Sequence, residues 1–292
     1  MARITLDENC PFSLDRTLRC GQVFRWEKAG EWWTGVVGHE VVRIRQQGRI
    51  LVFEGTSRER IRDYLGLNVD IGCILNSIDR DPVIHEAVAN STGLRLVHQP
   101  PWECLASYIC ATYSNIPGIR RKIALLCDSF GDVISGNPGS AFFAFPSAKA
   151  LADSAPCDLV RCRLGYRAPY LCATAREIAA DPGWIQRVEA LDYPSARREL
   201  MRLQGVGPKV ADCVLLFAFR KYEAFPVDVW IARIMQRYYG AGEKEGYERM
   251  SRRGREYFGP YAGYAQEYLY SERETLLSSD PGVQVPSSQL AI

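Results

Sequence analysis

A lysine and an aspartate in the last third of the chain have the types and spacing to do chemistry together. Lys209 ends the run Leu-Gln-Gly-Val-Gly-Pro-Lys that starts at Leu203, and Asp228 follows nineteen residues after the lysine. A primary amine at the start of a helix can attack an electrophilic carbon. A carboxylate nearby can orient the amine and stabilise a positive charge that grows during the attack. The pair therefore indicates nucleophilic catalysis by an amine.

The glycines before Lys209 predict a tight hairpin between two helices. Gly205 and Gly207 supply backbone freedom, and Pro208 suits a first helical position. The free N–H groups of such a turn can hold a phosphate oxygen. An ordinary helix–helix turn with a solvated lysine fits this short motif equally well, and Asp228 alone could be a helix N-cap. However, the helix after Lys209 is nearly all apolar, and desolvation at the start of such a buried helix favours the neutral, nucleophilic form of an amine.

The pattern along the rest of the chain predicts an α+β fold. The first part carries short aromatic and β-branched runs separated by turns, with helices at 57–66 and about 70–90. Helical periodicity then dominates. Predicted strands cover 22–26, 32–37, 40–44, 50–53 and 94–97, and predicted later helices cover 102–112, 118–130, 147–152, 166–180, 193–203, 208–219, 229–238 and 260–277.

We therefore expect an N-terminal antiparallel β-sheet domain with short helices at 1–99, followed by an all-helical body at 100–278 that contains the helix-hairpin-helix motif. The last helix is expected to pack back toward the N-terminal domain. Residues 279–292 are rich in Ser, Pro and Gln, and we expect this tail to be disordered.

Composition excludes several other classes of protein. The net charge of +2 and the pI near 8.0 are only mildly basic, so DNA binding must come from local clusters. The ten cysteines form no Cys-x-x-Cys pair and the three histidines are isolated, which argues against a zinc site. No cysteine follows Cys213, so a C-terminal iron–sulfur loop is excluded. No apolar run reaches the roughly 18–20 residues of a membrane span, and we expect a cytoplasmic protein with reduced thiols and no membrane partner.

The hairpin run together with Pro226-Val-Asp-Val resembles the helix-hairpin-helix-GPD DNA glycosylases, and Lys209-Val-Ala-Asp-Cys resembles the eukaryotic-type 8-oxoguanine DNA glycosylases. The resemblance runs from about Arg19 to Tyr270, and its further matching runs are 20–26, 103–105, 164–168 and 259–266. It implies a monomeric base-excision-repair enzyme whose partner is double-stranded DNA with an oxidised purine. It would be nucleoid-associated in a prokaryote or nuclear in a eukaryote.

The resemblance also implies a mechanism that needs no cofactor. The damaged nucleotide is flipped out of the duplex. Lys209 then attacks the anomeric carbon, expels 8-oxoguanine and leaves a Schiff base, and β-elimination cuts the strand on the 3′ side. Asp228 would stabilise the charge on the sugar and help orient or deprotonate the amine. No metal is required.

Four residues match positions that read the base in this family. The carbonyl of Gly21 would accept the extra ring N–H of oxidised guanine, and Cys213 would line the pocket. Gln266 would pair with the Watson–Crick edge, and Tyr270 would stack in the place of a phenylalanine. Taken singly, these residues could instead be a turn glycine, core packing and a surface amide.

A second group matches positions that contact DNA. Tyr166 and Arg167 match residues that wedge into the gap and contact the orphaned base. The hairpin residues, and a tryptophan in the place of a histidine, match contacts to the backbone. Carbonyls of the hairpin could also hold a monovalent cation. The DNA-contacting set is Asn115, Tyr166, Arg167, Gly205, Val206, Gly207 and Trp230, and the cation set is Met201, Leu203 and Val206.

One segment departs from the family pattern. Where the eukaryotic enzymes have three asparagines followed by an arginine, only Asn115 remains of the trio and Gly118 replaces the arginine. Our hypothesis is weak discrimination of the base opposite the lesion, with Arg167 as its main remaining reader. Two alternative functions stay open at this point: a glycosylase for other damaged bases, and a helix-hairpin-helix module that binds DNA without chemistry.

Overall fold

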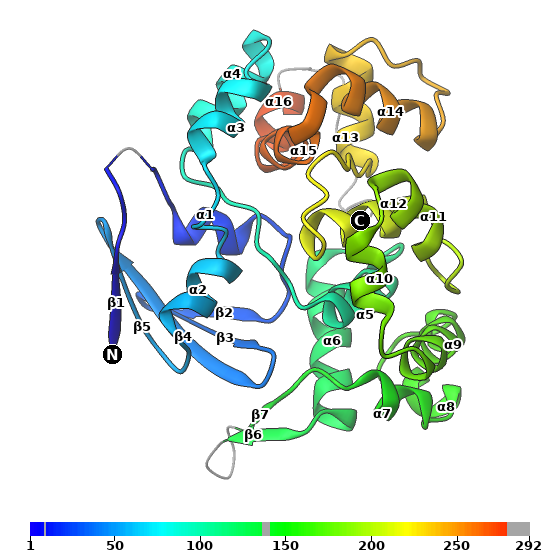
Figure 1. Ribbon diagram of the computed structural model, residues 1–292. Helices are drawn as coiled ribbons and strands as arrows, with labels where there is room; N and C mark the ends of the chain where they lie inside the picture. Colours follow the sequence, from blue (N-terminus) through cyan, green and yellow to red (C-terminus); the bar gives the residue numbers. More distant parts are fainter. Residues whose placement is uncertain (9, 136–140, 279–292) are drawn as a thin grey trace.

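A five-stranded antiparallel sheet lies beside a body of helices in the computed structural model, which describes residues 1–8, 10–135 and 141–278 (Figure 1). The strand order is β1-β5-β4-β3-β2. Consecutive strands β2 to β5 form a meander, and β1 adds to the β5 edge. The strands are β1 (Ala2–Thr5), β2 (Trp26–Ala29), β3 (Trp32–Val37), β4 (Glu40–Gln47) and β5 (Ile50–Glu54).

The sheet follows from alternation of side chains on its central strands. Val42 and Ile44 on β4 and Leu51 and Phe53 on β5 are buried in a core of their own, which also holds Trp26. The predicted strands at 32–37, 40–44 and 50–53 are confirmed. The predicted strand at 22–26 is wrong except for its last residue, and β1 was not predicted.

Four short helices precede residue 99: α1 (Leu14–Arg19), α2 (Arg58–Tyr64), α3 (Ile71–Ile78) and α4 (Pro82–Asn90). The first two pack with the sheet, whereas α3 and α4 lie in the core of the helical body and contact α15. The helix predicted over 70–90 is therefore two helices. The break occurs because Asp81 caps the second one, since its Oδ1 accepts from the N–H groups of Val83 at 2.8 Å and Ile84 at 3.1 Å.

The strand predicted at 94–97 is wrong, because this extended segment has no strand beside it. The side chain of Gln22 takes the place of a neighbouring strand. Its Nε2 donates to the Arg95 carbonyl and its Oε1 accepts from the Val97 N–H, both at 2.7 Å. The hydroxyl of Tyr268 donates to the Leu94 carbonyl at 3.0 Å. The segment thus ties the sheet domain to the helical body.

From α5 onward the chain is mostly helical, which confirms the α+β class. Its elements are α5 (Pro101–Ala111), α6 (Ile116–Phe130), β6 (Val133–Ser135), β7 (Phe142–Phe143), α7 (Ala148–Ala152), α8 (Pro156–Val160), α9 (Arg167–Ala180), α10 (Trp184–Ala190), α11 (Tyr193–Leu200), α12 (Pro208–Phe217), α13 (Val229–Tyr238), α14 (Tyr247–Phe258), a 3-10 turn (Gly259–Tyr261), α15 (Ala262–Ser271) and α16 (Arg273–Ser278). The helices α8, α10 and α14 were not predicted, and the last predicted helix is in fact the 3-10 turn with α15 and α16.

Two packing relations position the functional residues. The buried helices α5 and α12 lie against each other in the centre of the body. The helix α15 contacts α13 and α14 and also reaches α3 and α4, so a late segment of the chain lies beside an early one (Figure 1).

The division at residue 99 remains a prediction, and the predicted tail at 279–292 lies outside the described residues. Among those that are described, no helix is both long and apolar enough to cross a membrane.

Candidate active site and base pocket

The glycine hairpin is held against α9 at close range. Gly205 has φ +78°, in the left-handed region that favours glycine. A Cβ on this residue would lie 2.8 Å from the Cβ of Tyr170, so a larger residue would also clash. The hydroxyl of Thr174 donates to the Gln204 carbonyl at 2.7 Å. The hairpin is thus a fixed turn rather than a flexible loop.

The helix α12 begins with amide groups that have no partner in its first turn. Gly207 is its exposed N-cap residue and offers no side chain to cap it, and Pro208 follows. The first N–H groups of a helix lack intrahelical acceptors and attract anions. Lys209 lies half-buried in this first turn. Of the carbonyls expected to hold a cation, that of Leu203 accepts from the Val206 N–H at 3.2 Å.

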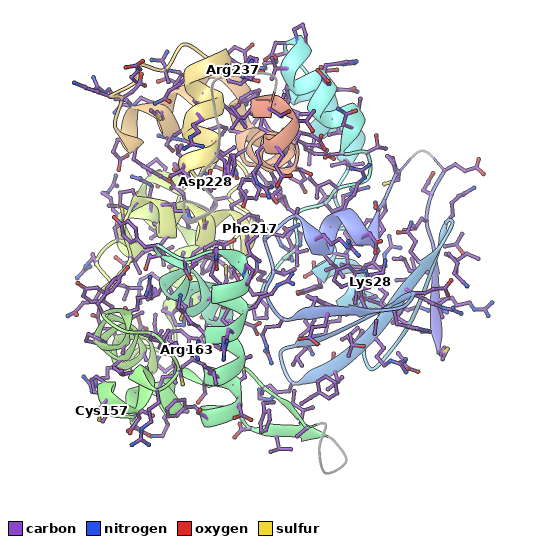
Figure 2. The ribbon with its side chains drawn as sticks, turned by 180° about the vertical axis from the view of Figure 1, so that it is seen from behind. Lys28, Cys157, Arg163, Phe217, Asp228 and Arg237 are labelled. Carbon is purple, nitrogen blue, oxygen red and sulfur yellow. The ribbon has the colours of Figure 1, made fainter. Side chains whose placement is uncertain are left out.

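The two carboxylate oxygens of Asp228 have different surroundings. Oδ1 caps α13 by accepting from the N–H groups of Trp230 at 3.0 Å and Ile231 at 2.8 Å. Oδ2 is buried and has no hydrogen-bond partner. Burial raises the pKa of Asp228, while the N–H of Ile231 and the nearby ammonium of Lys209 act to lower it. Figure 2 shows Asp228 at the end of α13 that lies toward the middle of the molecule. Both roles foreseen for this residue, cap and reactive carboxylate, are therefore compatible in one side chain.

Both residues line one pocket. Every residue predicted to contact the damaged base lines the same pocket, although the residues come from distant parts of the chain. Its lining is Gly21, Gln22, Phe24, Tyr108, Lys209, Cys213, Phe217, Pro226, Asp228, Gln266, Glu267 and Tyr270. The structure thus brings together the two predicted catalytic residues and the four predicted base-contacting residues.

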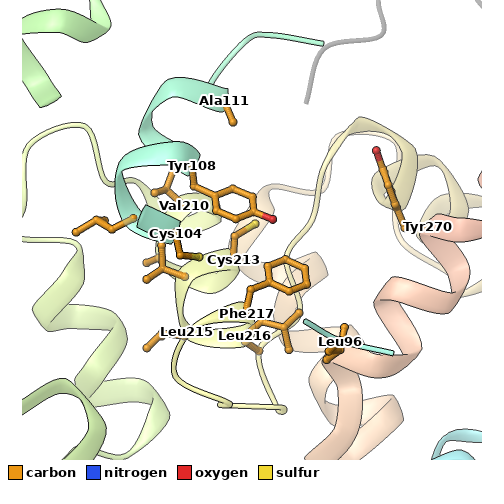
Figure 3. Packing of buried hydrophobic residues seen from close by; sticks show 14 of the residues in the cluster. Leu96, Cys104, Tyr108, Ala111, Val210, Cys213, Leu215, Leu216, Phe217 and Tyr270 are labelled. Atoms are coloured by element: carbon orange, nitrogen blue, oxygen red, sulfur yellow. The ribbon is translucent and has the colours of Figure 1, made fainter. Parts of the chain in front are cut away.

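The pocket has aromatic and sulfur-containing walls. Cys213, Tyr108 and Phe217 lie on one side and Tyr270 faces them from α15 (Figure 3). The guanidinium of Arg273, which is on α16, lies 4.2 Å from the ring centroid of Tyr270. Burial raises the pKa of Cys213 to about 12, so this thiol is neutral.

Gly21 lies at the edge of this space. Its φ is +111°, and a Cβ there would lie 3.0 Å from Cδ1 of Ile116 and 3.5 Å from Cε1 of Tyr270. The backbone conformation favours glycine, and a side chain here would press against Ile116. The neighbouring Gln22, held by its hydrogen bonds to the 94–97 segment, fixes the position of this loop.

Three oxygen atoms that belong to pocket residues are buried and have no hydrogen-bond partner. They are Oδ2 of Asp228, Oε1 of Gln266 and Oε1 of Glu267. Buried polar atoms in proteins are nearly always paired, so a cluster of exceptions in one pocket indicates atoms kept available for a ligand. Glu267 was not foreseen from the sequence. The one signal for it was a charged residue directly after Gln266 in a helix of small and aromatic residues.

The residues expected to contact the orphaned base do not line this pocket. Arg167 is only 8% exposed. Its Nε donates to the Thr112 carbonyl at 2.8 Å, and other guanidinium nitrogens donate to the carbonyls of Tyr113 and Leu164. The ring centroid of Tyr166 lies 4.4 Å from this guanidinium. Arg167 thus holds the 112–113 backbone and does not project from the surface.

Tyr113 is the residue that projects there, and the sequence did not single it out. Tyr113 is 86% exposed, and its φ of +48° is uncommon for a residue other than glycine. Tyr166 is half exposed, while Asn115 caps α6 through the Gly118 N–H at 2.9 Å. Trp230, expected near the DNA backbone, is 5% exposed.

Two family models together match most of the chain. Residues 3–105 match the N-terminal domain of 8-oxoguanine DNA glycosylase, and residues 115–260 match the HhH-GPD superfamily of base excision DNA repair proteins. The chain belongs to the 8-oxoguanine DNA glycosylase family of the HhH-GPD superfamily.

Relatives within this HhH-GPD family align over nearly their full length. A probable N-glycosylase/DNA lyase of Methanothermobacter thermautotrophicus is 34% identical, over 89% of this chain and 93% of that protein. The 8-oxoguanine glycosylase/lyase of Clostridium acetobutylicum is 32% identical in its apo form, with a TM-score of 0.84 over 89% of this chain and 92% of that one. The same enzyme bound to double-stranded DNA with cytosine opposite 8-oxoG has a TM-score of 0.85 at 31% identity, over 90% and 92% of the two chains.

Proposed function

We propose that this protein is a bifunctional DNA glycosylase and abasic-site lyase that removes 8-oxoguanine from double-stranded DNA. Its relatives named N-glycosylase/DNA lyase and the solved 8-oxoguanine glycosylase/lyases support the activity. The single observation that carries the assignment of roles is that Lys209, Asp228 and the base-contacting residues line one pocket. In a cell the protein would act on nucleoid DNA of a prokaryote or nuclear DNA of a eukaryote.

In the proposed reaction, the phosphate beside the flipped nucleotide binds the hairpin and the first turn of α12. The ammonium of Lys209 first gives up a proton, and the resulting amine attacks C1′ and forms a C–N bond while the C1′–N9 bond breaks. The base leaves with that electron pair and takes up a proton. The amine nitrogen then loses a proton while the C1′–O4′ bond breaks, and O4′ takes up a proton, so that the sugar ring opens and a Schiff base remains. Loss of a proton from C2′ then expels the 3′ phosphate, which cuts the strand. Water finally releases Lys209.

Asp228 has its buried Oδ2 available for the charged stages of this sequence. A carboxylate next to the sugar stabilises the positive charge that develops as the C1′–N9 bond lengthens. Because Oδ1 is fixed by the α13 cap, the group needs no reorganisation during the reaction. Within the pocket, Gln266 would read the Watson–Crick edge, the Gly21 carbonyl would accept the extra ring N–H, and Cys213 and Tyr270 would enclose the ring.

Borohydride trapping tests this function. A Schiff base reduced with borohydride leaves the protein covalently attached to DNA. We expect an adduct with an 8-oxoguanine duplex that is lost in Lys209→Gln and unaffected by EDTA. The absence of an adduct with this lesion, while other damaged bases trap, would favour the wider glycosylase alternative. Binding with no adduct on any lesion would favour the non-catalytic module.

The opposite-base preference is a separate proposal. The loop from Tyr113 to Gly118 lacks the residues that read cytosine in the eukaryotic enzymes. We propose weak discrimination, with excision at similar rates from duplexes that carry C, A, G or T opposite the lesion. A strong preference for C would contradict it.

A further inference from the structure

Glu267 is a buried carboxyl group in the base pocket that the proposed mechanism does not use. It lies on α15 directly after Gln266 and is 3% exposed. It lines the same pocket as Lys209, and its Oε1 has no hydrogen-bond partner. A buried polar atom without a partner is costly to the fold, so its retention in a ligand pocket points to a partner that the ligand supplies.

Burial shifts Glu267 toward its neutral form. Burial raises the pKa of Glu267 to about 7, and the charge of Asp228 adds to the rise. A hydrogen bond with the thiol of Cys20 and the charge of Arg273 act in the opposite direction but do not cancel the effect of burial. The titratable and charged groups that face it from the packed elements are Cys20, Tyr108, Lys209, Cys213, Asp228, Tyr270 and Arg273.

A neutral carboxyl group changes what the pocket can bind. The other unpartnered oxygens there, Oδ2 of Asp228 and Oε1 of Gln266, only accept hydrogen bonds. A protonated Glu267 adds an O–H donor among these acceptors. Oxidised guanine carries two ring carbonyl groups, which need donors, whereas a carboxylate in the same place would repel them.

We propose that Glu267 is a specificity-determining residue of the base pocket, whose neutral carboxyl group donates a hydrogen bond to a carbonyl oxygen of the flipped base. This inference rests on the proposed function, because it requires that a damaged base enters this pocket. It adds to the reading by Gln266 and Gly21 a donor that depends on pH.

Binding measurements in a Lys209→Gln background test the proposal, because the chemical step is then removed. The dissociation constant would be measured between pH 5.5 and 8.5 for a duplex with 8-oxoguanine and for one with a stable abasic-site analogue. We expect lesion affinity to weaken about tenfold as the pH rises through about 7, since one buried hydrogen bond is lost. The abasic duplex has no base, so its affinity should lack this step.

Variants of Glu267 identify the group responsible. Lys209→Gln/Glu267→Gln keeps the shape and an N–H donor but does not titrate, so lesion binding should be tight at both ends of the pH range. Lys209→Gln/Glu267→Ala should bind the lesion about tenfold more weakly at low pH. Lys209→Gln/Glu256→Gln removes the same charge from an exposed position and should keep the step.

Two results would overturn the inference. One is a pH step that persists in the Glu267→Gln variant, which would assign the step to another group. The other is lesion affinity in a folded Glu267→Ala variant equal to that of its parent, with folding checked by thermal unfolding. Either result with normal borohydride trapping of the wild type would leave the proposed function intact. Failure of trapping itself would instead contradict the function.

Discussion

Asp228 combines a structural and a chemical role in one residue, and its two oxygens can be separated by mutation. Asp228→Asn keeps an oxygen that can cap α13 but removes the negative charge. We expect excision to slow by about 10²–10³-fold with little change in the midpoint of urea unfolding. Asp228→Ala should lose the same activity and about 1 kcal/mol of stability, because the cap is also lost. Single-turnover excision by the Asn variant at the wild-type rate would contradict the role of the charge.

The environment of Asp228 also predicts the acid limb of the reaction. Burial raises its pKa above the ordinary value of 3.8, so the active carboxylate is protonated at a higher pH than usual as the pH falls. Excision should therefore decline on the acid side with a midpoint above that of a solvated aspartate. Measuring single-turnover rates in Glu267→Gln isolates this limb from the titration of Glu267. A rate that stays constant down to pH 4 would contradict the prediction.

Glu267 makes a matching prediction for stability. Its pKa is about 7 in the folded protein and about 4.5 when solvated, so the folded state holds the proton that the unfolded state releases between these values. The group thus lowers the free energy of unfolding as the pH rises through this window. Relative to wild type, Glu267→Gln should gain roughly 3 kcal/mol between pH 4.5 and pH 7.5. Urea unfolding of both proteins at several pH values measures the difference, and parallel curves would contradict it.

At the scale of elements, the loop between α5 and α6 presents an aromatic ring on a rigid support. The guanidinium of Arg167 holds the carbonyls of Thr112 and Tyr113, and the ammonium of Lys122 donates to the hydroxyl of Ser114. These contacts keep Tyr113 exposed in a left-handed backbone conformation. Arg167 therefore has donors committed to the loop, which supports a positioning role for it beside the reading role first assigned to it.

Substitutions in this loop should change affinity for the duplex without changing the pocket. Tyr113→Ala should weaken binding of the lesion duplex by about tenfold, because a stacking contact with a base is lost, while Tyr113→Phe should bind normally. Arg167→Ala should have an effect similar to Tyr113→Ala, since the loop loses its support. Measurements on single-stranded lesion DNA serve as the control, because no orphaned base is present. Normal duplex affinity in Tyr113→Ala would contradict this account.

Much of the fold and of the candidate site could be predicted from the sequence, because the signals for these parts lie within a few neighbouring residues. Strands at 32–37 and 50–53 and helices such as 229–238 carry clear periodicity or turn signals within a few residues. The hairpin and Asp228 were visible because glycine and proline mark sharp turns. By contrast, the strand wrongly predicted at 94–97 depends on Gln22, and the burial of Glu267 depends on Cys20 and Asp228. Such contacts join residues far apart in sequence and leave no local pattern.

At the scale of the molecule, the segment that joins the sheet domain to the helical body is held in place by Gln22. Its amide group contacts the backbone of Thr17, Arg95 and Val97. Gln22→Leu would leave these buried groups without partners, which should cost about 2–4 kcal/mol of unfolding free energy. Because Gly21 is the adjacent residue, lesion affinity should fall as well. Urea unfolding and lesion binding measure the two effects, and a change smaller than 1 kcal/mol would contradict the role of this amide.

The unpartnered oxygens of the pocket lower the stability of the fold and are expected to be needed for excision. Each one is a buried polar atom without a hydrogen-bond partner, so apolar side chains in these places would make the fold more stable. Gln266→Met together with Glu267→Met is therefore expected to raise the melting temperature while it lowers excision. Selection for thermal stability alone would replace these polar side chains with apolar ones and remove the activity of the pocket. The excision activity of any thermostable variant should therefore be measured together with its melting temperature.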